Sequence, residues 1–417
     1  MPKSIAAAYV PHLLHPGMHV YIPGLSGEST ILVEGLKAGA EHCAGVHFIG
    51  VWIPGMNRVD YAGLHPDARA TAFFATPDTR DSRAAGKIDH LPISYFAAYG
   101  HLRDRARVDL ALIHVSPPDA EGQCSLGLAN DFTPAVLDKS ATVVAHVNAR
   151  MPRTVGATTV AFDDLDFVVE AECDVLGEDT PLVAPWDVIG GHVAGLIEDG
   201  DTVEVGVGRV QSVYDALSGK RDIAVHAGLI GDAVMRAARS GVIADHAGAI
   251  TTGIAWGTRD LHDFVASDPR VRFAPVGWTH DIATLAAVER FVAVNSVIEV
   301  DLLGQANAEM IGGRQVGAAG GLTDFMRGAR ASRGGRAIVA LESTAKSGSV
   351  SRIVPALAEG TAIGVARGDM DIVVTEHGVA DLRGKAVDAR AETLIAVAAP
   401  GFRNALTEAW TERRRRM

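Results

Sequence analysis

The sequence predicts an α/β protein with two similar open-sheet domains, and three observations support this fold class. A chain of 417 residues is longer than one hydrophobic core usually serves, so two or more domains are expected. Short apolar runs alternate with glycine or proline turns and amphipathic stretches, a pattern typical of βα units over parallel strands. A glycine-rich turn follows a strand in each half, at 23–29 and 206–212, which suggests a duplicated architecture.

The individual elements follow from the same pattern. Near-continuous Val, Ile and Leu runs predict strands that are buried on both faces, over 19–24, 108–118, 141–148, 202–208, 336–343 and 370–378. Amphipathic stretches predict helices over 29–42, 212–219, 231–241 and 390–399. A polar, proline-marked stretch near 175–195 separates the two series, so we expect an N-terminal domain over 1–185 and a C-terminal domain over 186–417. The active site is expected in the cleft between them.

Composition excludes several classes of function. The net charge of −12 argues against a nucleic-acid surface, and the basic run 413–416 is interpreted as a solvated helix end. Cys43, Cys124 and Cys173 lie far apart without a CxxC pair, which predicts neither a disulfide framework nor a zinc site and favours a cytoplasmic protein. The N-terminus is a poor signal peptide, and the apolar runs are too short to span a membrane.

Short motifs of common enzyme classes are weak or missing. Gly206-Val207-Gly208 follows a strand as a dinucleotide-binding turn does, but Gln211 stands where the third glycine is expected. Neither a phosphate-binding GxxxxGK[ST] loop nor a GxSxG hydrolase turn occurs. His12 and His15 have helical spacing but lack a third ligand, so we expect no metal.

Seven longer segments are more specific, and they occur in one order along the chain: 115–136, 147–156, 205–217, 256–265, 293–329, 343–357 and 373–385. These segments resemble the acetyl-CoA hydrolase/transferase family, which is related to the class I CoA-transferases. The resemblance implies two α/β domains of the CoA-transferase type with the active site at their interface, and a homo-oligomer. It also implies coenzyme A as a substrate, a carboxylic acid as a second partner, and no tightly bound cofactor.

The resemblance assigns coenzyme A mainly to the C-terminal domain. Its contacts are expected from the turn Gly206, Val207, Gly208, Arg209 and Val210, and from a glycine loop that contains Gly320 and Gly321. The family pattern Ser-Gly-x-Gly-Gly-Gln reads here Gly317-Ala318-Ala319-Gly320-Gly321-Leu322. The two retained glycines allow a backbone N–H to serve the oxyanion, and they would look the same in a purely structural turn.

Family chemistry usually begins when a glutamate attacks the acyl-CoA thioester. That glutamate is expected in a His-[Thr/Ser]-Glu segment, where this chain has His226, Ala227 and Gly228. Glycine cannot be acylated, and no Asp or Glu lies between Ile223 and Gly231.

We therefore expect a hydrolase that cleaves the thioester, or the C–C bond of a β-keto acyl-CoA, by general-base activation of water. Glu28 is the first candidate base, followed by His226 and Glu121, whereas Glu299 and Asp301 are interpreted as structural. Two alternatives stay open: a CoA-transferase for a short-chain or dicarboxylic acid that uses another carboxylate, and a non-catalytic acyl-CoA-binding protein.

Overall fold

The computed structural model describes residues 1–416, which form two compact units. The first unit contains Met1–Asp179, Gly228–Asp232 and His246–Thr279. The second contains Thr180–Ala227, Ala233–Asp245 and His280–Met417, of which Met417 lies outside the described residues. The expected halves 1–185 and 186–417 were continuous, whereas the chain enters each unit more than once.

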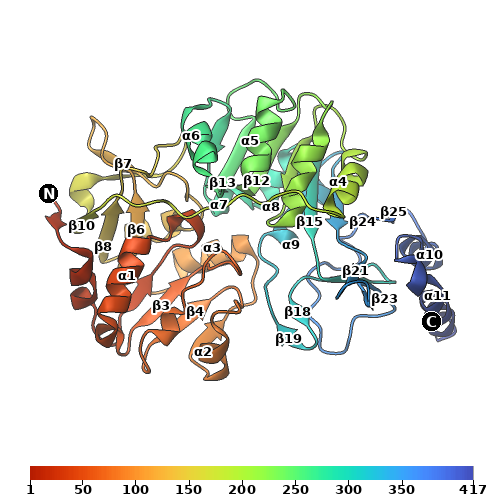
Figure 1. The fold of residues 1–417 in the computed structure, drawn as a ribbon, viewed down its shortest axis with the longest axis horizontal. Coiled ribbons are helices and arrows are strands. Elements are labelled where there is room, and N and C mark those ends of the chain that lie inside the picture. The colour runs from red at the N-terminus through yellow and green to blue at the C-terminus, as the bar shows by residue number, and fades with distance from the viewer. Residues whose placement is uncertain (417) are drawn as a thin grey trace. The chain divides into compact units, whose positions relative to one another are not determined.

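The first unit is built on an eight-stranded sheet in which every pair of neighbouring strands is parallel (Figure 1). Its order is β1 (Lys3–Ser4), β10 (Phe167–Glu170), β8 (Thr142–Val147), β6 (Leu110–Val115), β2 (His19–Tyr21), β3 (His47–Gly50), β4 (Arg69–Ala72) and β5 (Ile88–His90). The helices of this unit are α1 (Thr30–Ala38), α2 (Arg80–Ala84), α3 (Tyr95–Asp104), α6 (Arg259–Ser267) and α7 (Val276–Thr279). Two further short pairs are β7 (Gln123–Ser125) with β9 (Thr159–Ala161), and β13 (Ile250–Ala255) with β14 (Val271–Phe273).

Strand β6 explains why this sheet is buried on both faces. All six of its residues are buried, and consecutive side chains point to opposite faces. Ala111, Ile113 and Val115 belong to one hydrophobic cluster, and Leu110 and Leu112 belong to another. The continuous apolar run in the sequence therefore serves two cores at once.

The second unit has a sheet in the order β12 (Ala224–Ile230), β11 (Thr202–Val205), β15 (Phe291–Ser296), β20 (Arg336–Ala340), β24 (Ile372–Thr375) and β25 (Gly378–Asp381). Its pairs are parallel except that β25 runs antiparallel to β24. Strand β12 begins in this unit and ends, from Gly228, in the first. The helices are α4 (Trp186–Ala194), α5 (Asp232–Arg239), α8 (Ile282–Ala287), α9 (Leu322–Ala331), α10 (Val387–Ala396) and α11 (Arg403–Arg414).

Short strands complete the second unit. Strand β16 (Glu299–Asp301) pairs with β17 (Ala306–Asn307) and β23 (Ile353–Val354), and two small hairpins are formed by β18 (Met310–Ile311) with β19 (Arg314–Gln315) and β21 (Thr344–Ala345) with β22 (Val350–Ser351). Figure 1 shows α10 and α11 side by side at the C-terminal end, where the Trp410 indole donates to Asp388 (3.1 Å). No helix among the described residues has both the length and the apolar character needed to cross a membrane.

Each of the six predicted strands has a shorter counterpart at its predicted place. The helix predicted over 212–219 differs, because Arg209–Leu217 forms a 3₁₀ helix, η8. The Gln211 side chain there donates to the carbonyl oxygens of Val205 (2.9 Å) and Gly206 (3.0 Å). These two bonds tie the start of η8 back to the end of β11, which favours the tighter helix.

Candidate active site

Glu28 stands where strand β2 passes into helix α1. The chain turns at Gly24, where a Cβ atom would lie 2.0 Å from the carbonyl oxygen of Val51, so only glycine fits. A single 3₁₀ turn, η2 (Leu25–Gly27), leads to Glu28, and Ser29 begins α1 by accepting the Leu32 N–H (3.1 Å). The predicted glycine turn therefore exists, and it holds Glu28 beyond the carboxyl end of a sheet strand.

The Glu28 carboxylate is buried, with 4% of the residue exposed. Burial raises its pKa, because desolvation disfavours the charged form. The phenol of Tyr61 donates a hydrogen bond of 2.8 Å to Oε2, which opposes that rise, and the Asn57 side chain and the charge of Lys37 oppose it further. A carboxylate with a raised pKa is a stronger base when ionised, which suits proton abstraction near neutral pH.

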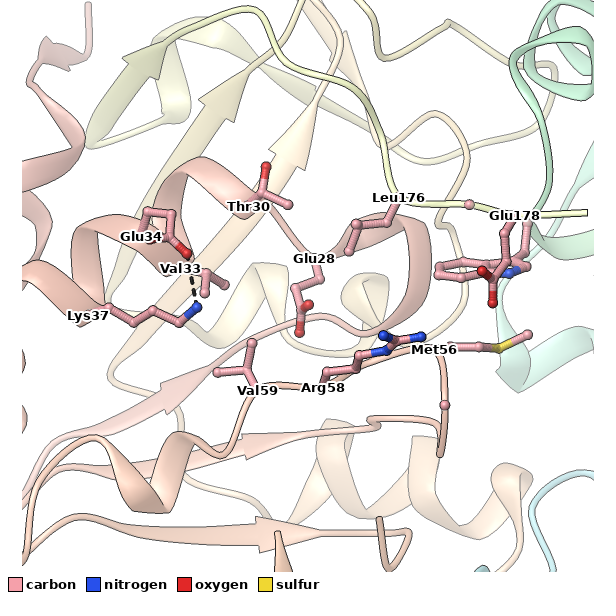
Figure 2. Close-up of a pocket in the computed structure, with 13 residues that line it drawn as sticks. Glu28, Thr30, Val33, Glu34, Lys37, Met56, Arg58, Val59, Leu176 and Glu178 are labelled. Atoms are coloured by element: carbon pink, nitrogen blue, oxygen red, sulfur yellow. Dashed lines mark hydrogen bonds and ion pairs between the residues drawn. The ribbon is translucent and has the colours of Figure 1, made fainter. Parts of the chain in front are cut away.

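A cavity of about 340 Å³ in the first unit opens beside Glu28. Its lining comes from α1, from the segment after β3 and from two later segments: Glu28, Thr30, Val33, Glu34, Lys37, Gly55, Met56, Arg58, Val59, Leu176, Gly177, Glu178 and Trp256. Figure 2 shows the Glu28 carboxylate directed toward the segment that carries Arg58 and Val59. The volume falls in the range of small-molecule sites.

Trp256 gives this cavity a second polar feature. Its ring is buried, yet its indole N–H has no hydrogen-bond partner among the described residues. A buried donor of this kind costs free energy unless a ligand or water accepts it. Glu28 and Trp256 thus both line this cavity, one with a buried acceptor and the other with a buried, unpartnered donor.

His226 lies on β12 in the second unit and is buried. Burial lowers the pKa of His280 to about 3, and the charge of the nearby His226 contributes to the same shift. The His280 ring packs on Phe325 (4.4 Å between centroids), and a Cβ atom on Gly321 would lie 2.6 Å from its Nε2. Gly320 has φ +54°, in the left-handed region that favours glycine. The predicted glycine pair is thus packed against a neutral imidazole.

The predicted coenzyme A turn follows β11, also in the second unit. A Cβ atom on Gly206 would lie 2.5 Å from the Asn295 side-chain oxygen, and Gly208 has φ +94°. Val207 is 44% exposed, so the turn presents an apolar side chain at the surface. The Arg209 guanidinium lies 3.5 Å from Glu342, whose carboxylate also accepts the Trp186 indole N–H (2.9 Å).

Two further carboxylates bear on the site. Glu121 was a predicted candidate base, whereas Glu204 was not predicted. Glu121 lies in an exposed turn between β6 and β7, where its backbone N–H donates to Asp119 (3.1 Å), and the described residues that line the cavity do not include it. Glu204 on β11 is buried and accepts the Asn295 amide (2.7 Å), and burial raises its pKa well above the usual range. Glu204 lies within the strand predicted over 202–208 to be buried on both faces, but its carboxylate was not among the predicted site residues.

The structure therefore places Glu28 and Glu121 in the first unit, and places His226, the turn 206–210 and the glycine pair in the second. Sequence reasoning missed Trp256 and Arg58 at the cavity, and His280 beside Gly321. Trp256 did carry a signal, since it begins one of the segments that resemble the family. Among the described residues, no group of three or more His, Cys, Asp or Glu could hold a metal ion.

Two family models match the chain: the acetyl-CoA hydrolase/transferase N-terminal domain over residues 2–176, and the C-terminal domain of the same name over 257–410. The 4-hydroxybutyrate coenzyme A transferase of Clostridium kluyveri is 36% identical over 395 residues, which cover 93% of this chain and 92% of that protein. An acetyl-CoA hydrolase of Candida albicans is 38% identical over 105 residues, covering 25% of this chain and 19% of that protein.

Solved structures agree with the family models. RipA from Yersinia pestis superposes with a TM-score of 0.91 at 25% identity, covering 99% of this chain and 98% of that one. The 4-hydroxybutyrate CoA-transferase of Porphyromonas gingivalis gives a TM-score of 0.80 at 30% identity, covering 100% and 98%. The fold class and the family resemblance inferred from the sequence are thereby confirmed. This chain belongs to the acetyl-CoA hydrolase/transferase family.

Proposed function

We propose that this protein hydrolyses a small acyl-CoA thioester, with Glu28 as the general base. The observation that carries the proposal is the buried Glu28 carboxylate, with its raised pKa, in a cavity of about 340 Å³. Ionised Glu28 takes a proton from a water molecule, and the resulting hydroxide attacks the thioester carbonyl carbon. The C–S bond breaks, and coenzyme A leaves as a thiolate that takes up a proton from solvent. A positioned base typically contributes about 10²–10⁴-fold in rate.

Strand β12 favours hydrolysis over group transfer. None of its seven residues, Ala224–Ile230, is an acid, and the family resemblance expects the nucleophilic glutamate at Gly228. Transfer by a covalent route needs an acyl-enzyme and then a glutamyl-CoA intermediate, and both require that carboxylate. Hydrolysis by water requires neither.

Coenzyme A is assigned to the second unit. We propose that the turn 206–210 contacts its pantetheine arm, since Val207 offers exposed apolar surface and the glycines allow the backbone to approach closely. The backbone N–H groups of Gly320 and Gly321 are proposed oxyanion donors. His226 remains a second candidate base, and Glu121 becomes a weaker one because its turn is exposed.

The test uses acetyl-, propionyl- and butyryl-CoA with the purified protein, and follows release of the free thiol with and without added carboxylic acids. Hydrolysis predicts thiol release that needs no acid, with one ¹⁸O atom from labelled water in the product acid. Glu28→Gln is expected to lower kcat at least about 100-fold. Glu121→Gln tests the weaker candidate base, and it is expected to keep the wild-type rate if Glu28 is the base. Equal rates in wild type and Glu28→Gln would contradict the assignment of the base.

CoA transfer is the second candidate, because relatives over most of the chain are named CoA-transferases. It predicts acid-dependent exchange with ping-pong kinetics and a trapped glutamyl-CoA thioester. Measurable binding of acyl-CoA with no turnover over the panel would instead favour a binding protein.

A further inference from the structure

A second cavity, of about 450 Å³, lies in the second unit at the edge of its sheet where β20 and β24 begin. Gly335 immediately precedes β20 and Asp371 immediately precedes β24, and both line the cavity. Strand β25 runs antiparallel to β24, so its end, followed by Leu382 and Arg383, reaches the same edge.

This edge is opposite to the one that carries the predicted coenzyme A turn. Strands β11, β15, β20 and β24 are mutually parallel, and the turn 206–210 follows the carboxyl end of β11. Glu342, which pairs with Arg209, likewise follows the carboxyl end of β20. Strand β20 has five residues, so the two edges are separated by roughly 16 Å of strand. The cavity is therefore distinct from the turn 206–210.

Positively charged side chains outnumber negatively charged ones around this cavity. Five cations and one carboxylate line it: Arg330, Arg367, Arg383, Lys385, Arg390 and Asp371. Asp371 pairs with Arg330, and it also accepts the Ala337 backbone N–H. Arg383 pairs with Asp381 through two hydrogen bonds, of 3.0 and 2.7 Å.

Three cations remain without a carboxylate. The Lys385 ammonium donates to the Thr393 hydroxyl (2.8 Å), and in the described chain neither Lys385, Arg367 nor Arg390 forms an ion pair. The neighbouring carboxylate of Asp369 pairs with Arg327 (3.3 Å) instead. The cluster therefore gathers uncompensated positive charge in a chain whose net charge is −12.

Arg390 shows how tightly these cations are held. Its guanidinium donates to the carbonyl oxygens of Arg367 (3.0 Å) and Leu382 (3.3 Å), which fix it at the cavity. Burial lowers its pKa, the charges of Arg330 and Arg367 lower it further, and the charge of Asp371 opposes this shift. Like charges held together destabilise a fold unless an anion relieves the repulsion.

We propose that this cavity binds a small molecule through a diphosphate group. Planar guanidinium groups bind phosphate oxygens through paired hydrogen bonds, and three uncompensated cations match the charge of a diphosphate near neutral pH. The cavity volume suits a metabolite. The diphosphate can be free pyrophosphate or part of a nucleoside diphosphate, and both present the same chemistry to the cations.

Isothermal titration of the full-length protein with pyrophosphate, and separately with ADP, tests the proposal. Arg367→Gln removes an exposed guanidinium and is expected to weaken pyrophosphate binding at least about tenfold, since charge-assisted hydrogen bonds are lost. Arg367→Lys is expected to recover part of the affinity. Arg333→Gln is the matched control, because Arg333 is exposed in the same unit and pairs only weakly with Glu289 (3.6 Å), and it should bind as wild type.

Tighter binding of ADP than of pyrophosphate would identify a nucleoside diphosphate as the ligand, and equal or weaker binding would identify the diphosphate group alone. Absence of saturable binding of both probes, or equal affinity in wild type and Arg367→Gln, would overturn the proposal. Loss of pyrophosphate binding in saturating coenzyme A would show that the cavity belongs to the coenzyme A site, which would also overturn it. Circular dichroism of each variant checks that the fold is kept.

Discussion

At the scale of single residues, the Tyr61 phenol opposes the rise that burial causes in the pKa of Glu28. Its hydrogen bond of 2.8 Å is a direct contact with the buried carboxylate. Tyr61→Phe removes that donor, so the pKa of Glu28 should rise further, because the bond favours the ionised form. The acidic limb of the kcat/KM–pH profile should therefore move to higher pH. Leaving a buried acceptor without its donor should also lower the free energy of unfolding by about 1–3 kcal/mol.

The pH profile separates this role from a purely structural one. Steady-state kinetics across the pH range should show a shifted limb with an unchanged plateau at high pH, where Glu28 is ionised in both proteins. A uniform fall in rate at every pH, with the limb in place, would mean that Tyr61 only supports the fold. Denaturation with urea measures the stability change independently.

The sequence predicted some residues of the site and missed others for physical reasons. Glu28 could be predicted from the sequence because the turn that carries it lies between a strand and a helix that are only a few residues apart in the chain. Trp256 lines the same cavity from far along the chain, and His280 meets Gly321 from another loop. Such pairings depend on tertiary packing, which one sequence without relatives does not display.

At the scale of elements, we expect that the glycine loop before α9 needs Gly321 for its close packing. Gly321→Ala places a methyl group 2.6 Å from His280 Nε2 and 3.1 Å from the Phe325 ring, and both of these side chains are buried. Overpacking of this kind typically costs about 1–3 kcal/mol of unfolding free energy. Gly317→Ala is the matched control in the same loop, since its nearest contact is 3.4 Å from the Ala308 carbonyl oxygen. Equal thermal stability of the two variants would contradict the packing role.

Strand β12 carries the second prediction at this scale. If the Gly228 position is that of the family nucleophile, Gly228→Glu should create acid-dependent CoA transfer between acetyl-CoA and butyrate. Exchange kinetics and mass-spectrometric detection of a glutamyl-CoA adduct measure the gain. A folded variant without transfer would show that the position does not face the thioester. Gly231→Glu, outside the strand, controls for a new carboxylate placed nearby.

Some strands and helices could be predicted from the sequence more easily than others. Strand β6 was clear because burial on both faces requires an unbroken apolar run. Strand β12 is interrupted by His226 and Gly228, so its sequence does not read as a core strand although most of it is buried. The helix after Gly208 was expected from its amphipathic residues, but the two local bonds from the Gln211 side chain to the end of β11 are side-chain contacts that periodicity does not contain.

At the scale of the whole molecule, the two continuous domains expected from the sequence can be tested directly. The first unit needs later segments of the chain: the backbone N–H of Asn130 donates to the Gly253 carbonyl (2.9 Å), and that of Val276 donates to Asp131 (3.0 Å). Four core residues of this unit also lie beyond residue 185, namely Leu229, Ile254, Trp256 and Val276. The sequence marked a boundary through its polar stretch, but a chain that returns to an earlier unit leaves no such mark.

A fragment of residues 1–185 should therefore fail to fold stably. Burial of a large apolar side chain contributes about 1.5–3 kcal/mol, so the four missing residues remove roughly 6–12 kcal/mol. That loss is comparable to the entire stability of a typical domain, about 5–15 kcal/mol. Near-ultraviolet circular dichroism and urea denaturation should show no fixed tertiary structure and no cooperative transition. Residues 1–279 retain all four side chains and are the matched control. This longer fragment should unfold in urea with a cooperative transition. A cooperative transition in the shorter fragment would establish that the first 185 residues form a self-sufficient domain, as the sequence suggested.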